Sequence, residues 1–280
     1  MSYDLTHWPQ IDLAKARAAF REVPLEAYPA LGYLSRAQIH ERLAGQGGLF
    51  LAHDMAQLLK LGPGMRVLDL GCGAGVTSIF LARTYGVNVS AVDEGLPDDL
   101  VQRATAAGVG HLITPVRADC RRLPFPDRHF DAIFAMNSFF YFGTDELYPC
   151  SLLRFLKEGG ELVIGSPCYR EELSADTPAE FLLEFPACLA VHSPDWWRDH
   201  FMKTGQVAVP HCAIHPRGGE FWEDRVRFLL ETAPHPDLPW WRDMVHAMIR
   251  MLNRDRDGFV SHFMLHARKS GPPPVLGKAG

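Results

Sequence analysis

Cysteine is scarce and dispersed in this chain of 280 residues. The six cysteines are Cys72, Cys120, Cys150, Cys168, Cys188 and Cys212. Structural zinc sites and disulfide frameworks need cysteines in close pairs or at regular spacings, and no C-x-x-C pair is present. The sequence therefore predicts neither kind of site, and we expect the protein to work in a reducing cytoplasm.

Long apolar runs and an excess of positive charge are also lacking. No stretch reaches the ~18 apolar residues that a membrane helix needs, and the N-terminus carries acids early without an apolar segment, so we expect neither a membrane span nor a secretory leader. Lysine and arginine total 28 against 33 aspartates and glutamates. The largest basic group is the trio Arg117, Arg121 and Arg122, which is too small for the basic stripe of a nucleic-acid binder.

What the chain does contain is a regular alternation of short apolar strands with helices. The predicted strands are 66–70, 87–93, 113–119, 130–136, 161–166, 206–211 and 258–269. The predicted helices are 12–20, 35–43, 49–62, 76–86, 97–108, 145–160, 193–205, 220–232 and 240–252. This alternation indicates an α/β fold, with a mostly parallel sheet and helices on both faces.

We predict a single domain over residues 1–270. Its parts are an N-terminal helical cap (1–48), a ligand-binding core (49–170) and a helical lid (212–257) inserted between the sixth and seventh strands, and a disordered tail (271–280) follows it. The tail is assigned from its proline and glycine content and its terminal position.

The most informative stretch is RVLDLGCGAGVTS at 66–78. Its glycines follow a G-x-G-x-G pattern, and Val76 occupies the place of the third glycine in the dinucleotide fingerprint G-x-G-x-x-G. A pyrophosphate at this loop would be repelled by the carboxylate of Asp69, whereas a cationic ligand would be attracted. Bare backbone at Gly71 and Gly73 beside Asp69 therefore favours S-adenosylmethionine, which carries an ammonium and a sulfonium.

Acidic residues at the ends of the next two strands complete this prediction. Asp93 ends the second strand, where a carboxylate can accept hydrogen bonds from both hydroxyls of a ribose. Asp119 ends the third, where it could accept from the adenine amino group, while Cys120 would present its backbone N–H to the ring.

Four segments resemble the successive motifs of class I S-adenosylmethionine-dependent methyltransferases. They are VLDLGCGAG, VSAVDEG, ADCRRLPFPDRHFDAIFAMNS and FLKEGGELVIGSP, within about residues 45–170. YFGTDELY and HSPDWWRDHFMKTG further resemble a bacterial small-molecule group labelled cyclopropane-fatty-acyl-synthase-like. The resemblance implies a Rossmann-like sheet of seven strands with an antiparallel last strand. It also implies cofactor contacts at Asp69, Gly71, Gly73, Asp93, Asp119, Cys120 and Asn137, the last through backbone near the methionine moiety.

Methyl transfer from a sulfonium requires alignment and exclusion of water more than acids and bases. Phe221, Trp222 and other aromatic residues of the lid could roof a small-molecule acceptor. Where the acceptor must lose a proton, the candidate bases are His192, our first choice, Tyr141 and His215. We predict no metal site, because no acidic residue stands at ligand spacing from the histidines.

Two other functions and one assembly stay open at this point. A nicotinamide-dependent oxidoreductase would use the same sheet architecture, although Val76 and Asp69 argue against it. A non-catalytic protein that binds S-adenosylmethionine is compatible with the same motifs, because in-line transfer needs no obligatory catalytic residue. A homodimer is kept as a candidate assembly.

Overall fold

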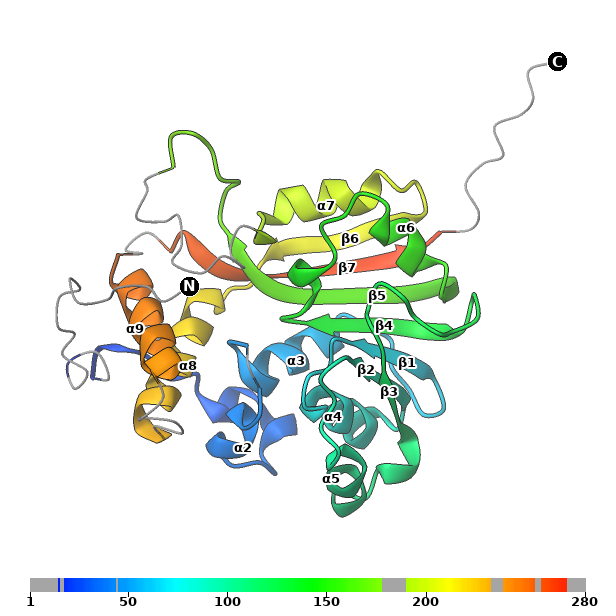
Figure 1. Ribbon diagram of the computed structural model, residues 1–280, viewed down its shortest axis with the longest axis horizontal. Helices are drawn as coiled ribbons and strands as arrows, with labels where there is room; N and C mark the ends of the chain where they lie inside the picture. Colours follow the sequence, from blue (N-terminus) through cyan, green and yellow to red (C-terminus); the bar gives the residue numbers. More distant parts are fainter. Residues whose placement is uncertain are drawn as a thin grey trace.

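The computed structural model describes residues 15, 18–43, 45–177, 190–232, 239–254 and 258–270. The predicted tail at 271–280 and part of the predicted cap, residues 1–14, lie outside the described residues. Within the described part, the chain folds around one twisted sheet with helices on both faces (Figure 1).

The sheet has seven strands in the order β3-β2-β1-β4-β5-β7-β6. The strands are β1 (Arg66–Leu70), β2 (Asn88–Asp93), β3 (Ile113–Arg117), β4 (Phe130–Met136), β5 (Leu156–Tyr169), β6 (Val207–Ile214) and β7 (Val260–Lys269). The pairs from β3 to β5 are parallel, and β7 runs antiparallel to both β5 and β6. The predicted Rossmann-like sheet of seven strands with an antiparallel last strand is therefore confirmed.

Helices connect these strands and cover them. The α-helices are α2 (Arg36–His40), α3 (Gly48–Gln57), α4 (Val76–Tyr85), α5 (Leu100–Ala106), α6 (Tyr148–Leu153), α7 (Pro194–Met202), α8 (Gly218–Thr232) and α9 (Pro239–Arg254). The short 3-10 turns are η1 (Leu25–Ala27), η2 (Pro29–Leu31), η3 (Gly110–Leu112) and η4 (Phe139–Tyr141). Two of the helices, α8 and α9, lie between β6 and β7 in the chain, where the sequence predicts a lid.

Two apolar layers lie on the two faces of the sheet, because successive side chains of a strand point to opposite sides. Val67 of β1 belongs to the layer that contains Met55 of α3 and Phe80 of α4. Its neighbour Leu68 belongs to the layer that contains Trp197 of α7. The apolar run of β1 is buried on both sides, as expected for a central parallel strand.

Several helix ends follow the local sequence signals. Ser35 caps α2 through a capping box with Gln38, and Ser193 caps α7 by accepting a hydrogen bond from the backbone N–H of Trp196 at 3.3 Å. Helix α4 ends at Tyr85, and Gly86, which follows it as the C-cap, has a left-handed φ of 67°. These are the residue types that favour helix starts and ends.

The predicted helix at 145–160 is wrong in its second half. Helix α6 ends at Leu153, and β5 begins at Leu156, which pairs with Phe130 of β4. The backbone N–H groups of His129 and Phe130 both donate to the carbonyl of Phe155, at 2.8 and 2.9 Å. Burial of Phe155 and Leu156 against β4 outweighs their helical spacing, and the ladder is irregular between Phe130 and Ala132.

Two further findings concern composition. None of the helices in the described ranges is long and apolar enough to cross a membrane. The five cysteines that the structure describes as free are Cys72, Cys120, Cys150, Cys168 and Cys212.

Candidate functional site

The glycine loop joins the end of β1 to the start of α4, and its first glycine is required by close packing. The backbone N–H groups of Gly71 and Cys72 both donate to the carbonyl of Val92, at 2.9 and 3.0 Å. A Cβ on Gly71 would lie 2.5 Å from the Cβ of Ser138, and the φ of Gly71 is 71°. Because both the space and the left-handed backbone exclude larger residues, Gly71 lets the loop pass against the segment after β4.

The second glycine faces open space. A Cβ on Gly73 would meet no atom within 4 Å, although its φ of 54° also favours glycine. Its N–H donates to Oδ2 of Asp93 at 2.8 Å. Bare backbone with room beside it is what a closely approaching ligand requires, so this part of the loop fits a bound cofactor.

Asp93, a predicted cofactor contact, ends β2 and lies beside the glycine loop. Its two carboxylate oxygens accept from the N–H groups of Gly73 and Gly95, each at 2.8 Å. Each carboxylate oxygen has a second lone pair, so the side chain can accept further hydrogen bonds from a ligand.

Asp69 lies beneath the loop and is 1% exposed. Its Oδ2 accepts hydrogen bonds from the hydroxyls of Thr77 and Ser78 in the first turn of α4, both at 2.6 Å. Burial raises the pKa of Asp69 to about 6, although these two hydroxyls favour the charged form. Because Asp69 is buried and its Oδ2 already accepts two hydrogen bonds, its charge would attract a cationic ligand across the loop without direct contact.

Asp119 and Cys120 follow β3 on the same edge of the sheet. The Asp119 carboxylate accepts from the backbone N–H of Arg121 at 2.8 Å, and the guanidinium of Arg121 donates to the carbonyl of Tyr141 at 2.9 Å. The carbonyl of Cys120 accepts from the hydroxyl of Tyr148 at 2.8 Å. Burial raises the pKa of the Cys120 thiol to about 12, so this thiol is uncharged and unreactive at neutral pH.

Asn137 stands directly after β4 and joins the core to the N-terminal cap. Its backbone N–H donates to the carbonyl of Gly165 at 2.8 Å, and its Nδ2 donates to the carbonyl of Gln46 at 2.7 Å. Its Oδ1 is buried and has no hydrogen-bond partner among the described residues. A buried acceptor without a partner costs free energy, so Oδ1 is a candidate contact for a ligand. Sequence reasoning missed Gln46, although the glycines on either side of it are an unusual run before a helix.

The two predicted catalytic residues lie on different segments. His192 precedes α7, with its Nδ1 2.7 Å from Oε1 of Glu172 and its ring stacked on Trp196 at 3.8 Å between centroids. Tyr141 lies on η4, is 60% exposed, and its ring centroid is 4.1 Å from that of Phe140. Their roles in catalysis stay predictions.

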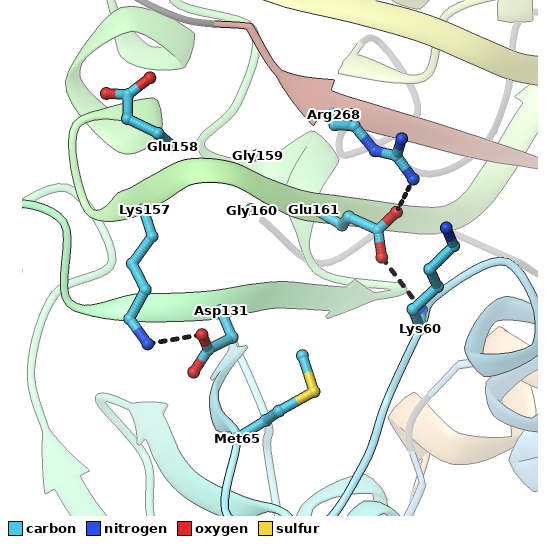
Figure 2. Close-up of a pocket in the computed structure, with 9 residues that line it drawn as sticks. All are labelled: Lys60, Met65, Asp131, Lys157, Glu158, Gly159, Gly160, Glu161 and Arg268. Atoms are coloured by element: carbon cyan, nitrogen blue, oxygen red, sulfur yellow. Dashed lines mark hydrogen bonds and ion pairs between the residues drawn. The ribbon is translucent and has the colours of Figure 1, made fainter.

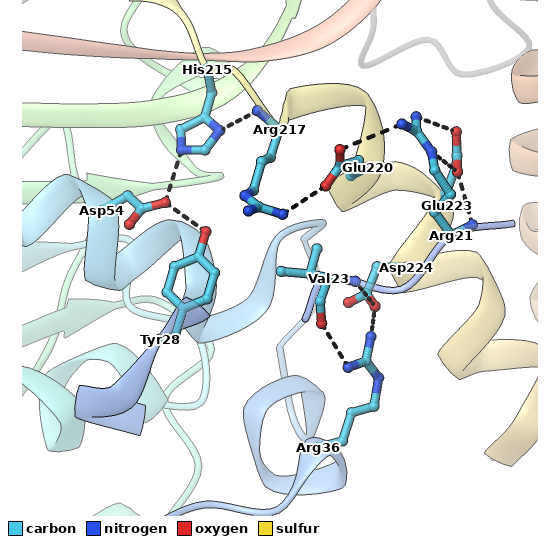
Figure 3. Close-up of polar contacts among 10 residues, drawn as sticks. All are labelled: Arg21, Val23, Tyr28, Arg36, Asp54, His215, Arg217, Glu220, Glu223 and Asp224. Atoms are coloured by element: carbon cyan, nitrogen blue, oxygen red, sulfur yellow. Dashed lines mark hydrogen bonds and ion pairs between the residues drawn. The ribbon is translucent and has the colours of Figure 1, made fainter. Parts of the chain in front are cut away.

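A second polar cluster, which the sequence did not predict, surrounds Asp54 of α3 (Figure 3). Its Oδ2 accepts from the hydroxyl of Tyr28 at 2.8 Å and contacts Nε2 of His215 at 2.9 Å, while Oδ1 lies 3.0 Å from Nδ1 of His53. Burial favours the protonated acid, but these three contacts outweigh it and lower the pKa of Asp54 to about 2. His215, a candidate base, is therefore engaged with a charged carboxylate.

A cavity of about 370 Å³ opens at the opposite edge of the sheet, near the starts of β4 and β5 (Figure 2). Four of its charged side chains form two pairs with one another. Lys157 bonds Asp131, and Glu161 accepts from Arg268 at 2.9 Å and from the backbone N–H of Lys60 at 3.0 Å. In open α/β sheets ligands bind at the carboxyl ends of the strands, so the glycine-loop edge is the candidate site.

Comparison with known proteins agrees with this choice. Residues 67–160, which contain the glycine loop, Asp93 and Asn137, match the model of a family described as a methyltransferase domain. A phosphoethanolamine N-methyltransferase from Triticum aestivum is 29% identical over 168 residues, which cover 58% of this chain and 32% of that protein. The chain thus spans about a third of the length of this relative.

Two solved structures are similar over most of the chain. Phosphoethanolamine N-methyltransferase 2 from Haemonchus contortus, in complex with S-adenosyl-L-methionine, has a TM-score of 0.67 at 16% identity and covers 88% of this chain and 59% of its own. The [4+2]-cyclase SpnF has a TM-score of 0.65 at 19% identity, and the match covers 90% of this chain and 98% of the SpnF chain.

These likenesses, at low identity, establish the fold. The resemblance to class I methyltransferases is confirmed at the level that these comparisons reach: the chain has the fold of that class, and residues 67–160 match the methyltransferase-domain model. The narrower resemblance to the cyclopropane-fatty-acyl-synthase-like group stays a prediction.

Proposed function

We propose that the protein is a methyltransferase that uses S-adenosylmethionine and a small-molecule acceptor. One observation carries the proposal: inside the matched domain, the open backbone of Gly73 lies beside the carboxylate of Asp93 at the carboxyl edge of the sheet. This pair offers what an adenosine with an uncharged linkage needs, namely close access to backbone and an acceptor for ribose hydroxyls.

The other predicted contacts are assigned along the same edge. Asp119 would accept from the adenine amino group, and the N–H of Cys120 would face the ring. Backbone of Gly71 and Asn137 would line the methionine end, where the buried charge of Asp69 favours a cation. When bound, S-adenosylmethionine supplies an electrophilic methyl group; the residues named here hold it in place.

The chain's further contribution would be alignment and exclusion of water. The ring of Phe221 on α8 packs beside Gly47, and the carbonyl of the preceding residue, Gln46, accepts from Asn137, so α8 reaches the same edge. We propose the residues 212–257 as a lid and 1–48 as a cap within one domain. A dry, aligned site strengthens every electrostatic contact within it.

For acceptors that must lose a proton, we propose His192 as the base. Glu172 holds its Nδ1, which would leave Nε2 to take the proton. Such a pairing of a base with an orienting carboxylate is common in enzymes. Tyr141, exposed on η4, is proposed at the mouth of the site.

Relatives support a nitrogen acceptor as the first class to test, because the names of several refer to phosphoethanolamine or glycine derivatives. We also propose a cytoplasmic location, which the five free cysteines support. A homodimer stays a proposal that sedimentation analysis can test.

A protein that binds S-adenosylmethionine without methyl transfer is the second candidate. SpnF, described as a [4+2]-cyclase, shares this fold over 90% of the chain, so the fold also serves other chemistry. A nicotinamide enzyme is disfavoured by the position of Val76 and by the buried charge of Asp69.

Two measurements test the proposal. Calorimetry should detect S-adenosylhomocysteine binding and no NADH binding. Incubation with S-adenosylmethionine labelled in its methyl group, against phosphoethanolamine, sarcosine and dimethylglycine, should give labelled product with at least one acceptor. Tight NADH binding without S-adenosylhomocysteine binding would overturn the proposal. Cofactor binding without transfer to any acceptor in a wider panel would favour the second candidate.

A further inference from the structure

The covering part of the molecule is built from two segments that are far apart in sequence. Arg225 of α8 donates to the carbonyls of His40 and Leu43, at 3.0 and 2.6 Å. Asp224, also on α8, accepts from the backbone N–H of Val23 at 3.0 Å and lies against the guanidinium of Arg36 (Figure 3). We call residues 21–43 together with α8 the two-part lid.

These contacts are buried, which ties the two halves firmly together. Asp224 is 1% exposed and Arg225 is 8% exposed. Separating the halves would leave the carboxylate of Asp224 and the guanidinium of Arg225 buried without these partners, which is strongly unfavourable. The two halves are therefore expected to move as one unit.

Both halves meet the core at one carboxylate. Tyr28, from the N-terminal half, donates its hydroxyl to Asp54 of α3, and His215, three residues before α8, contacts the same Oδ2. Since the N–H of Arg217 donates to Nδ1 of His215, the ring proton is on Nε2 and is donated to Asp54. Asp54 is thus a shared attachment point between the lid and α3.

A short segment, which we call the strap, connects the N-terminal half of the two-part lid to the core at a second place. The strap, Gly45–Gln46–Gly47–Gly48, leads into α3, and Gly47 and Gly48 have φ values of 85° and 51°. Left-handed glycines can change φ and ψ at little steric cost, as hinge positions require.

The strap closes directly on Asn137. A Cβ on Gly45 would lie 2.2 Å from Nδ2 of Asn137, and Nδ2 donates to the carbonyl of Gln46 at 2.7 Å. Because a carbonyl can only accept, the amide orientation of Asn137 is fixed by chemistry. The next residue, Ser138, packs on Gly71 and donates to the carbonyl of Leu70 at 2.8 Å.

We propose that Asn137 is a positioning residue whose side-chain amide latches the two-part lid over the glycine loop. The lid then opens when this hydrogen bond breaks and φ and ψ change at Gly47 and Gly48, which admits and releases ligands. The inference rests on the proposed function only for its effect on turnover; the latch itself is a property of the fold.

The latch is tested with Asn137→Asp and Asn137→Gly. The first keeps the shape but sets a carboxylate against the Gln46 carbonyl, and the second removes the amide while suiting the φ of 52°. The matched control is Asn88→Asp, because Nδ2 of Asn88 also donates to a backbone carbonyl, that of Gly64 at 3.3 Å. Hydrogen exchange is measured with and without S-adenosylhomocysteine, after near-UV circular dichroism confirms folding.

Both Asn137 variants should speed amide exchange at least fivefold in residues 36–43 and in α8 together, and Asn88→Asp should not. Unchanged exchange in folded Asn137→Gly and Asn137→Asp would overturn the latch. Faster exchange in residues 36–43 alone would overturn the single moving unit. With an active acceptor, kcat/KM should fall about tenfold in both variants. If the wild type transfers no methyl group, the proposed function fails and the exchange result still decides the latch.

Discussion

Asp69 beneath the glycine loop and Asp224 in the two-part lid are both carboxylates with 1% exposure, yet the chain holds them in different ways. Asp69 accepts from two neutral hydroxyls, eight and nine residues further along. Asp224 lies against the guanidinium of Arg36 and accepts from Val23, 201 residues away. The loop is therefore assembled locally, whereas the lid depends on contacts between distant parts of the chain.

The largest effect is expected from Asp224→Ala, which removes the carboxylate between Arg36 and His40. Burial, together with the charges of Arg225 and Arg36, lowers the pKa of His40 to about 3, so His40 is neutral and Arg36 is the cation that loses its nearest carboxylate. Loss of one partner of a buried pair costs about 3–5 kcal/mol. We expect a loss near 3 kcal/mol in urea unfolding, because Arg36 is partly exposed.

The control for this change is Asp224→Asn, which keeps the shape and an acceptor for the N–H of Val23 and should cost less. A loss below about 1 kcal/mol for Asp224→Ala would show that the lid is held mainly by apolar packing.

The second prediction concerns the charge of Asp69. Its pKa is raised from 3.8 to about 6, so between these values the folded protein holds a proton that the unfolded chain has released. The stability contributed by this group is therefore greatest below about pH 4 and falls as the pH rises to about 6. Two pKa units correspond to about 3 kcal/mol at most.

Asp69→Asn keeps an acceptor for the two hydroxyls but does not titrate. Urea unfolding of both proteins from pH 4 to 7 should show the variant gaining stability relative to the wild type across this interval, by an amount approaching that maximum. A stability difference between the two proteins that does not change with pH would mean that folding does not raise the pKa of Asp69.

The contrast also explains how far the sequence could predict the structure. Residues 66–70 and 130–136 were predicted as strands, and β1 and β4 have these bounds, because each is a short apolar run bounded by turns. The helix predicted over 145–160 was wrong in part because periodicity cannot show that Phe155 and Leu156 pack against β4.

The candidate site divides in the same way. Gly73 and Asp93 were predicted together and meet at 2.8 Å, because both follow the carboxyl ends of neighbouring parallel strands. The contact between Gln46 and Asn137 spans 91 residues, and the Asp54 cluster joins three segments. Spacing along the chain carries no signal for such contacts, since they depend on how α3, α8 and the cap pack.

The third prediction addresses the local half of the comparison. Asp93→Ala should weaken S-adenosylhomocysteine binding at least tenfold in calorimetry, because hydrogen bonds to a charged group contribute about 1.5–3 kcal/mol each and 1.4 kcal/mol is tenfold. Asp127→Ala serves as the control, since this exposed residue precedes β4 and contacts Arg154 at 3.6 Å. Equal affinities of Asp93→Ala and the wild type would remove the ribose assignment.

The smallest effect is expected at the exposed end of the lid. Arg21 contacts Glu223 of α8 through Nε and Nη2, both at 2.8 Å, but its side chain is 60% exposed. Exposed pairs contribute about 0.2–1 kcal/mol and are screened by salt. Arg21→Ala should therefore lower the free energy of unfolding by under 1 kcal/mol at low salt, and the difference should shrink in 1 M sodium chloride, where the Debye length is ~3 Å. If Arg21→Ala cost as much as Asp224→Ala, burial would not be what distinguishes the strong contacts of the lid from the weak ones, and the contrast with Asp69 would have to be explained by geometry alone.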